Sequence, residues 1–148
     1  MASIVLAGGG TAGHIEPALA VARVWQSANP KDEIRFLGTA QGLENTLIPA
    51  AGFSVSNIPK VRISRKPSPS WLNIPFDLVA SVKACHSLLK GADLLIGFGG
   101  YVSAPAYIAA RILGVPTIIH EANAKPGWAN RLGALFTPYL AIAHGVNA

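Results

Sequence analysis

Short apolar runs alternate along the chain with longer segments in which apolar residues recur every three or four positions. The short runs are rich in Ile, Val, Leu and Phe and are typical of buried strands, whereas the longer spacing favours amphipathic helices. The runs predict strands over residues 4–7, 34–37, 53–58, 94–96, 117–120 and 140–143. The periodic segments predict helices over about residues 14–27, 42–51, 72–90, 103–113 and 128–136.

This alternation predicts one α/β domain of the Rossmann-like, doubly wound type, with a parallel sheet covered by helices on both faces. Crossovers between parallel strands are right-handed, and the expected strand order places the first and fourth strands side by side. In the helix predicted over 72–90, Leu78, Val82, Cys85 and Leu89 recur at helical spacing. We expect this stripe to face the sheet.

The composition agrees with a folded domain whose strands are buried. Of the 148 residues, 51% are hydrophobic and only 13% are charged, which excludes a disordered tail. No apolar run approaches the roughly 20 residues of a membrane-spanning helix, and no basic segment precedes the first apolar run, so we expect neither a span nor a secretory leader. Cys85 is the single cysteine, which favours a reducing, cytosolic location and a packing role for its thiol.

A glycine-rich turn follows the first predicted strand and opens the first helix. Residues 8–13, G-G-G-T-A-G, satisfy the G-x-G-x-x-G spacing, in which the backbone can approach a phosphate and the helix N-terminus offers free N–H groups. A dinucleotide-dependent dehydrogenase would also carry an acidic residue at the end of the second strand. Gly38 and Thr39 stand there instead. The turn therefore indicates an anion site and disfavours a nicotinamide cofactor.

Two further polar turns follow the fourth and fifth predicted strands. Residues 97–103, G-F-G-G-Y-V-S, again open a helix, and residues 120–127, H-E-A-N-A-K-P-G, follow the next strand. If the first and fourth strands are neighbours, all three turns meet at the carboxyl edge of the sheet, where doubly wound folds bind ligands. The alternatives are a tight turn that needs positive φ, a helix cap at Ser103, and caps or turns at Glu121 and Asn123.

His14 is the side chain at this edge best suited to proton transfer near neutral pH, because imidazole gains and loses its proton there. Its alternative role is to cap or pack the helix. His86, His120 and His144 are scattered, and with Cys85 they show no metal-ligand spacing. We therefore expect no metal bound by this domain.

The segment between the third strand and the third helix departs from the alternation, because it mixes basic and apolar residues around several prolines. Apolar groups ringed by Lys and Arg suit an anionic membrane surface, whereas the alternative folds the aromatics back onto the core. The candidate membrane-facing residues are Arg62, Arg65, Lys66, Trp71, Ile74 and Phe76. The net charge of +5 suits an anionic partner. The basic residues cluster in one loop, however, and no aromatic residues are placed to stack on bases at a sheet face, which disfavours nucleic acid as the partner.

Three motifs together resemble one family, the MurG glycosyltransferases. They are G-G-T-x-G-H at residues 9–14, G-x-G-G-Y-V-S at 97–103 and H-E-x-N at 120–123, in an order and spacing that cover nearly the whole chain. The resemblance implies the glycosyltransferase-B (GT-B) fold, with residues 1–148 as the Rossmann-like, acceptor-binding N-terminal domain and the C-terminal donor-binding domain missing. We accordingly expect the chain to be an isolated or truncated half, inactive alone.

The activity implied by the resemblance is an inverting transfer of N-acetylglucosamine from UDP-N-acetylglucosamine (UDP-GlcNAc). The acceptor would be the C4 hydroxyl of an undecaprenyl-linked muramoyl-pentapeptide, converting lipid I to lipid II in peptidoglycan synthesis. The enzyme would work as a peripheral protein at the cytoplasmic face of the bacterial membrane. The resemblance implies no cofactor in this domain. A stand-alone module that binds a pyrophosphate-lipid or a nucleotide without catalysis is the alternative that the sequence leaves open.

Residue by residue, the resemblance implies that His14 takes the proton from the attacking hydroxyl. Positions matching the lining of the donor-sugar site are Thr11, Ala12, Gly13 and Asn123. Positions expected near the acceptor and its pyrophosphate are Gly10, Gly99, Gly100, Tyr101, Ser103 and Glu121. Two residues depart from the family pattern. Ala12 replaces a glycine, which is tolerable if its φ is negative, and Ala122 replaces a glutamine, so no contact that needs this amide is expected.

Overall fold

A computed structural model describes residues 1–62, 64 and 66–144 of the chain. Its sheet has six strands in the order β3-β2-β1-β4-β5-β6, and every neighbouring pair is parallel. The strands are β1 (Ser3–Gly8), β2 (Glu33–Gly38), β3 (Ser54–Asn57), β4 (Leu94–Gly99), β5 (Thr117–Glu121) and β6 (Leu140–Ile142). The predicted doubly wound sheet is confirmed, including the adjacency of the first and fourth strands.

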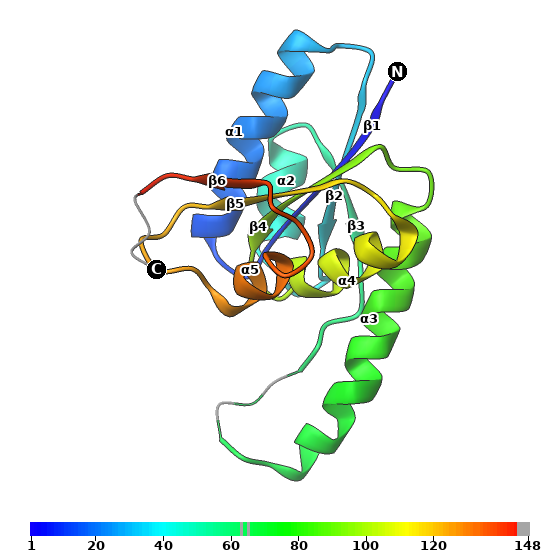
Figure 1. Ribbon diagram of the computed structural model, residues 1–148, viewed down its shortest axis with the longest axis vertical. Helices are drawn as coiled ribbons and strands as arrows, with labels where there is room; N and C mark the ends of the chain where they lie inside the picture. Colours follow the sequence, from blue (N-terminus) through cyan, green and yellow to red (C-terminus); the bar gives the residue numbers. More distant parts are fainter. Residues whose placement is uncertain (63, 65, 145–148) are drawn as a thin grey trace.

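Helices cover both faces of this sheet (Figure 1). One face packs against α1 (Ala12–Ala28) and α2 (Glu44–Ala50), and the other against α3 (Ile74–Leu89), α4 (Ser103–Leu113) and α5 (Trp128–Gly133). A short 3-10 helix, η1 (Pro69–Asn73), leads into α3. Since side chains alternate along a strand, Ile4 and Leu6 of β1 join the core under α1, whereas Val5 and Ala7 join the core under α4.

The stripe predicted on the third helix packs against the sheet in its second half. Cys85 and Leu89 are fully buried, and Val82 packs against the same core cluster. Leu78, one turn earlier, is only partly buried. The reason is visible in Figure 1, where the first turns of α3 extend beyond the body of the domain. Burial raises the pKa of the Cys85 thiol to about 12, in keeping with its predicted role as packing.

Several helix boundaries differ from the predicted ones, and the second helix, for example, begins at Glu44, two residues later than predicted. The first helix begins at Ala12, two residues earlier than predicted, because Thr11 is the extended residue that precedes it. His14 therefore lies inside the first helical turn. The third helix is preceded by the 3-10 turn because Pro75 lacks the N–H group that an α-helix continuous with this turn would need. The fifth helix ends at Gly133 and leaves residues 134–136 outside it.

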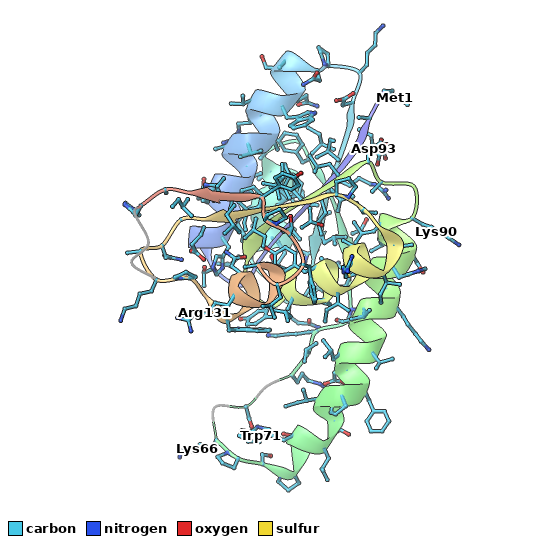
Figure 2. The ribbon with its side chains drawn as sticks, in the orientation of Figure 1. Met1, Lys66, Trp71, Lys90, Asp93 and Arg131 are labelled. Atoms are coloured by element: carbon cyan, nitrogen blue, oxygen red, sulfur yellow. The ribbon has the colours of Figure 1, made fainter. Side chains whose placement is uncertain are left out.

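A projecting segment, residues 59–77 apart from the undescribed positions 63 and 65, leaves the domain between β3 and the first turn of α3 (Figure 1). Lys66 and Trp71 lie at its far end (Figure 2). The Trp71 indole N–H donates to the Ser64 hydroxyl over 3.0 Å, so this ring folds onto the segment itself and not onto the core. None of the described helices combines the length and the apolarity needed to cross a bilayer.

Candidate functional site

The first two glycine turns touch through their backbones. Gly100 has φ +83°, and a side-chain carbon there would overlap the carbonyl oxygen of Gly9. Gly10 has φ +88°, and a Cβ added to it would lie 2.9 Å from Cε2 of Tyr101. Both positions need glycine, for the positive φ and for the lack of space. The predicted meeting of the turns after β1 and β4 at the carboxyl edge of the sheet is confirmed.

The His14 ring lies against the second glycine turn. A Cβ added to Gly99 would be 3.1 Å from its Nε2, and one added to Gly100 would be 3.2 Å from its Nδ1. The Nδ1 atom is also 3.2 Å from the Gly9 carbonyl oxygen and 3.2 Å from the Thr11 hydroxyl oxygen. The imidazole is partly buried, at the junction of the two turns.

These contacts determine which nitrogen of neutral His14 carries the proton. A carbonyl oxygen can only accept a hydrogen bond, so the contact with Gly9 is attractive only if Nδ1 is the N–H donor. The Thr11 hydroxyl is compatible with this, because it can accept as well as donate. The lone pair of the neutral ring therefore resides on Nε2, beside Gly99, which makes Nε2 the atom able to accept a proton.

A buried carboxylate, Glu44, holds the first glycine turn in place through hydrogen bonds from the protein interior. It accepts a hydrogen bond from the Thr39 N–H over 2.8 Å, from the Thr39 hydroxyl over 3.1 Å, and a long one from the Gly10 N–H over 3.4 Å. Glycines at 9, 38 and 42 leave the room that its side chain occupies. The carboxylate thus ties the end of β2 to the first turn. Because Glu44 is fully buried, it offers no oxygen to a ribose.

The third polar turn is organised around Glu121, which is only 5% exposed. One carboxylate oxygen accepts from the Asn123 backbone N–H over 2.9 Å and from its side-chain amide over 3.0 Å. The other accepts from the Gly127 N–H over 3.2 Å and from the Asn130 amide over 2.8 Å. Both oxygens are engaged inside the protein. A direct bond from Glu121 to the acceptor is therefore not supported, and its role is to fold the turn.

Asn130 joins this third turn to the second. Its amide nitrogen donates to the His120 carbonyl over 3.1 Å, and its side-chain oxygen accepts from the Tyr107 hydroxyl over 2.7 Å. A Cβ added to Gly99 would lie 3.4 Å from the same amide nitrogen. Asn130 and His14 thus both lie beside Gly99. The turns after β1, β4 and β5 consequently gather at one edge of the sheet.

The charges in this network follow from its hydrogen bonds. Burial raises the pKa of Glu121, but the hydrogen bonds from Asn123, Asn130 and Gly127 outweigh burial and leave the pKa below its ordinary value. Glu121 is therefore an anion at neutral pH. Burial raises the pKa of Tyr107, so its hydroxyl stays protonated and remains a donor to Asn130.

Ser103 braces the second turn and does not face the ligand side. It is fully buried, and its hydroxyl accepts from the Gly99 N–H over 3.0 Å and lies 2.8 Å from the Ala7 carbonyl oxygen. A direct bond between this hydroxyl and the acceptor pyrophosphate is therefore not supported. Ser103 is also not the helix cap, because Val102 occupies that position.

The remaining predicted site residues lie at the surface of the same edge. Tyr101 is 38% exposed, and the four positions predicted to line the donor sugar are exposed, namely Thr11, Ala12, Gly13 and Asn123. Ala12 has a negative φ, since only glycines among the described residues have positive values, so the methyl group is tolerated as expected. Among the described residues, no three His, Cys, Asp or Glu side chains gather as metal ligands would. Contacts of these residues with substrates stay predictions.

Comparison with known families decides the relationship. A family model described as Glycosyltransferase family 28 N-terminal domain matches residues 4–146. The chain belongs to this family. A protein of Acidothermus cellulolyticus is 51% identical over 142 residues, and one of Frankia casuarinae is 49% identical over 145 residues. Both are named UDP-N-acetylglucosamine--N-acetylmuramyl-(pentapeptide) pyrophosphoryl-undecaprenol N-acetylglucosamine transferase.

These matches cover 95% and 96% of the chain but only 38% of each relative, so the family 28 chain spans less than half the length of the proteins it matches. Among solved structures, MurG of Acinetobacter baumannii superposes with a TM-score of 0.83 at 30% identity, over 98% of this chain and 41% of that one. The Streptomyces glycosyltransferase SsfS6 superposes with a TM-score of 0.63 at 15% identity, which shows a shared fold. The GT-B type of N-terminal domain expected from the motifs is thereby confirmed.

Sequence reasoning missed Glu44 and Asn130 as parts of the site. Neither residue belongs to one of the three motifs. The one local signal for Glu44 is the pair of glycines at 38 and 42, which leave space for a buried side chain. For Asn130 no local signal exists, because its partners Tyr107 and Glu121 come from other elements.

Replacement of Glu121 by Gln tests the third turn. The amide NH₂ of Gln would face donors from Gly127 and Asn130, so we expect a loss of about 1–3 kcal/mol in the free energy of unfolding at pH 7. Because the folded state lowers the pKa of Glu121, its stabilisation is present above the unfolded pKa and disappears as pH falls through the folded pKa. The difference between the two proteins should therefore shrink as the pH drops below about 4.

Urea denaturation of both proteins across this pH range measures the effect. Glu33→Gln is the matched control, because Glu33 makes a surface ion pair with Arg35 that contributes little. A Glu121→Gln variant as stable at pH 7 as the Glu33→Gln variant would contradict the role assigned to Glu121.

Proposed function

We propose that this chain is the acceptor-side half of an inverting N-acetylglucosaminyltransferase that uses UDP-GlcNAc. The proposed acceptor is the C4 hydroxyl of an undecaprenyl-linked muramoyl-pentapeptide. The observation that carries the proposal is the placement of His14, whose Nε2 is free to accept a proton at the junction of the two glycine turns. The names of the relatives at 49–51% identity support the choice of donor and acceptor. A donor-binding domain beyond this chain completes the enzyme.

The proposed reaction is a single displacement. Nε2 of His14 removes the proton from the acceptor C4 hydroxyl while that oxygen attacks the anomeric carbon of N-acetylglucosamine. The bond between the anomeric carbon and the UDP phosphate breaks, and UDP carries away the electron pair. Attack from the side opposite UDP inverts the anomeric configuration. The Gly9 carbonyl, which accepts from Nδ1–H, stabilises the imidazolium that forms.

The glycine turns supply the anion-binding part of the proposed site. The first turn of α1 presents backbone N–H groups and the positive end of the helix dipole beside His14. Thr11, Ala12, Gly13 and Asn123 are exposed at this edge and are proposed to line the donor sugar. Gly10, Gly100 and Tyr101 are proposed to border the acceptor pyrophosphate, whereas Gly99 is buried and its N–H donates to Ser103, so its proposed role is to shape the turn. No step is assigned to a metal or a cofactor in this domain.

The activity is tested by joining residues 1–148 to the C-terminal remainder of the Acidothermus cellulolyticus relative and following transfer from UDP-GlcNAc to a lipid-linked acceptor. Replacing His14 by Ala should lower kcat by about 10²–10⁴, the usual contribution of a general base. His86→Ala, a histidine on α3 outside the site, serves as the control and should retain normal turnover.

Equal turnover by the fusion protein and its His14→Ala variant would remove the assignment of the base. A folded fusion protein that binds UDP-GlcNAc and the acceptor but transfers no sugar would contradict the proposed function. That result would favour a module that binds the pyrophosphate-lipid without catalysis.

The projecting segment is proposed to meet the anionic membrane surface on the cytoplasmic side. Leu72 and Phe76 are 77% and 76% exposed, and Trp71 is 42% exposed. Lys66 lies beside Trp71 at the far end of the segment (Figure 2). Ile74 is partly buried and adds less apolar surface. Apolar side chains next to basic ones suit the boundary between lipid headgroups and acyl chains.

Of the other two basic residues predicted to face the membrane, Arg62 is exposed but forms an ion pair with Asp77 over 3.8 Å. Arg65 lies outside the described residues. The proposed membrane contact therefore rests on the apolar side chains and on Lys66.

Vesicle binding tests the membrane contact. The double variant Leu72→Ser, Phe76→Ser should bind phosphatidylglycerol vesicles at least about tenfold more weakly in a sedimentation assay, because burial of each side chain contributes about 1.5–3 kcal/mol. Leu135→Ser is the matched control, since Leu135 is equally exposed at 79% but lies outside the projecting segment. Comparable weakening by Leu135→Ser, or undiminished binding by the double variant, would contradict the assignment.

A further inference from the structure

Lys60 stands where the chain leaves the sheet and enters the projecting segment, three residues after the end of β3. Its ammonium nitrogen lies 5.3 Å from the centroid of the Tyr101 ring, within the range of a cation–π contact. The same ring packs against Gly10 of the first glycine turn. Lys60 is thereby held next to both glycine turns, although it comes from a different part of the chain.

The charge of Lys60 is not compensated by a neighbouring carboxylate. Asp77, the acid of this region, pairs with Arg62 and also accepts from the Arg62 backbone N–H over 3.4 Å. Within residues 1–62, 64 and 66–144, no carboxylate oxygen lies within 4.0 Å of the Lys60 ammonium. The Lys60 ammonium therefore contacts an aromatic ring, forms no ion pair with a described carboxylate, and can bind an anionic ligand.

The surface around Lys60 is hollowed and is lined by charged side chains. Two depressions, of about 510 and 360 Å³, are both lined by Lys60, Arg62 and Asp77. The first also includes Gln41, which follows β2 at the carboxyl edge of the sheet. The second reaches Ser70, in the 3-10 turn of the projecting segment. Together they lead from the sheet edge toward the far end of that segment.

We propose that Lys60 binds the diphosphate of the lipid-linked acceptor, between the membrane-facing side chains and the glycine turns. The inference rests on the proposed function and adds a specific phosphate ligand to it. In such an acceptor the diphosphate lies between the prenyl chain and the sugar. On the protein, Lys60 lies at the base of the projecting segment, between its far end, where Trp71 lies, and the turns that hold His14. The order of groups on the ligand thus matches the order of residues on the surface.

Lys60 and the glycine turns are expected to contribute different interactions to diphosphate binding. Backbone N–H groups of the turns provide directional hydrogen bonds, whereas the ammonium provides a full positive charge against a group that carries at least two negative charges. The contact with Tyr101 restricts the lysine before the ligand arrives, so less side-chain entropy is lost on binding. Lys60 therefore acts in binding the acceptor and takes no part in proton transfer.

The first test measures the affinity of the chain itself for geranyl diphosphate, a soluble prenyl diphosphate, by NMR titration. Lys60→Gln should weaken binding about tenfold or more, the usual effect of losing one charged hydrogen bond, and Lys60→Arg should recover most of the affinity. Lys90→Gln is the matched control, since Lys90 is an exposed lysine at the other end of α3 (Figure 2). Unchanged affinity in Lys60→Gln would overturn the inference.

A second arm separates the acceptor diphosphate from lipid headgroups. Lys60→Gln should leave binding to phosphatidylglycerol vesicles within about twofold of the original chain, whereas Lys66→Gln should weaken it and leave geranyl diphosphate binding unchanged. The reverse pattern, in which Lys60→Gln weakens only the vesicle binding, would place Lys60 on the membrane surface and contradict the inference.

A third arm uses the fusion protein and a short-chain acceptor in detergent. Lys60→Gln should raise KM for the acceptor about tenfold, with little change in kcat and none in KM for UDP-GlcNAc. If the unaltered fusion protein transfers sugar and Lys60→Gln does not change the acceptor KM, the inference fails while the proposed function stands. If the unaltered fusion protein is inactive, the proposed function fails, and the diphosphate titration decides the role of Lys60 separately.

Discussion

The site depends on one backbone contact, between the Gly9 carbonyl and the Cα of Gly100. Two turns from neighbouring strands approach so closely that a side chain on Gly100 would overlap the Gly9 carbonyl oxygen, and the imidazole of His14 lies beside both turns. The contact exists because β1 and β4 are adjacent at the switch point of the sheet, from which the strand order runs outward in both directions. The Gly9 carbonyl oxygen also determines the His14 tautomer. The same oxygen atom therefore limits position 100 to glycine and leaves Nε2 of His14 able to accept a proton.

Buried polar side chains hold the three turns in place through hydrogen bonds inside the protein. Glu44 ties the first turn to the end of β2, Ser103 closes the second turn onto β1 and β4, and Glu121 with Asn130 closes the third. A buried carboxylate is costly unless its oxygens are hydrogen-bonded, and the hydrogen bonds of Glu121 lower its pKa in spite of burial. The buried polar residues hold the turns rigid, and the exposed residues of the carboxyl edge remain available to bind ligands. In this arrangement Lys60 is an exception, because it reaches the edge from the projecting segment.

Much of this arrangement could be predicted from the sequence because the signals are local. Apolar runs predicted all six strands, and glycines at fixed spacing after β1 and β4 predicted the turns that meet. The sequence left the roles of Ser103 and Glu121 open between a ligand contact and a structural contact, because a polar side chain after a strand looks the same in the sequence whether it faces a ligand or the interior. Asn130 and Lys60 meet the turns only through the tertiary fold, across 31 and 41 residues from Gly99 and Tyr101. The spacing of residues along the chain does not predict such long-range contacts.

The most direct measurement of the central geometry is a nuclear Overhauser effect between the His14 ring protons and the Hα protons of Gly99 and Gly100 in the isotope-labelled chain. A Cβ built on Gly99 or Gly100 would lie 3.1 or 3.2 Å from a ring nitrogen of His14, so the glycine Hα that points in this direction is close to the ring and predicts a strong cross-peak. The Gly9 contact predicts ring ¹⁵N shifts of a neutral imidazole protonated at Nδ1. Assigned spectra without these cross-peaks, or with the proton of the neutral ring on Nε2, would show that the turns do not meet around His14 in the way the proposed base requires.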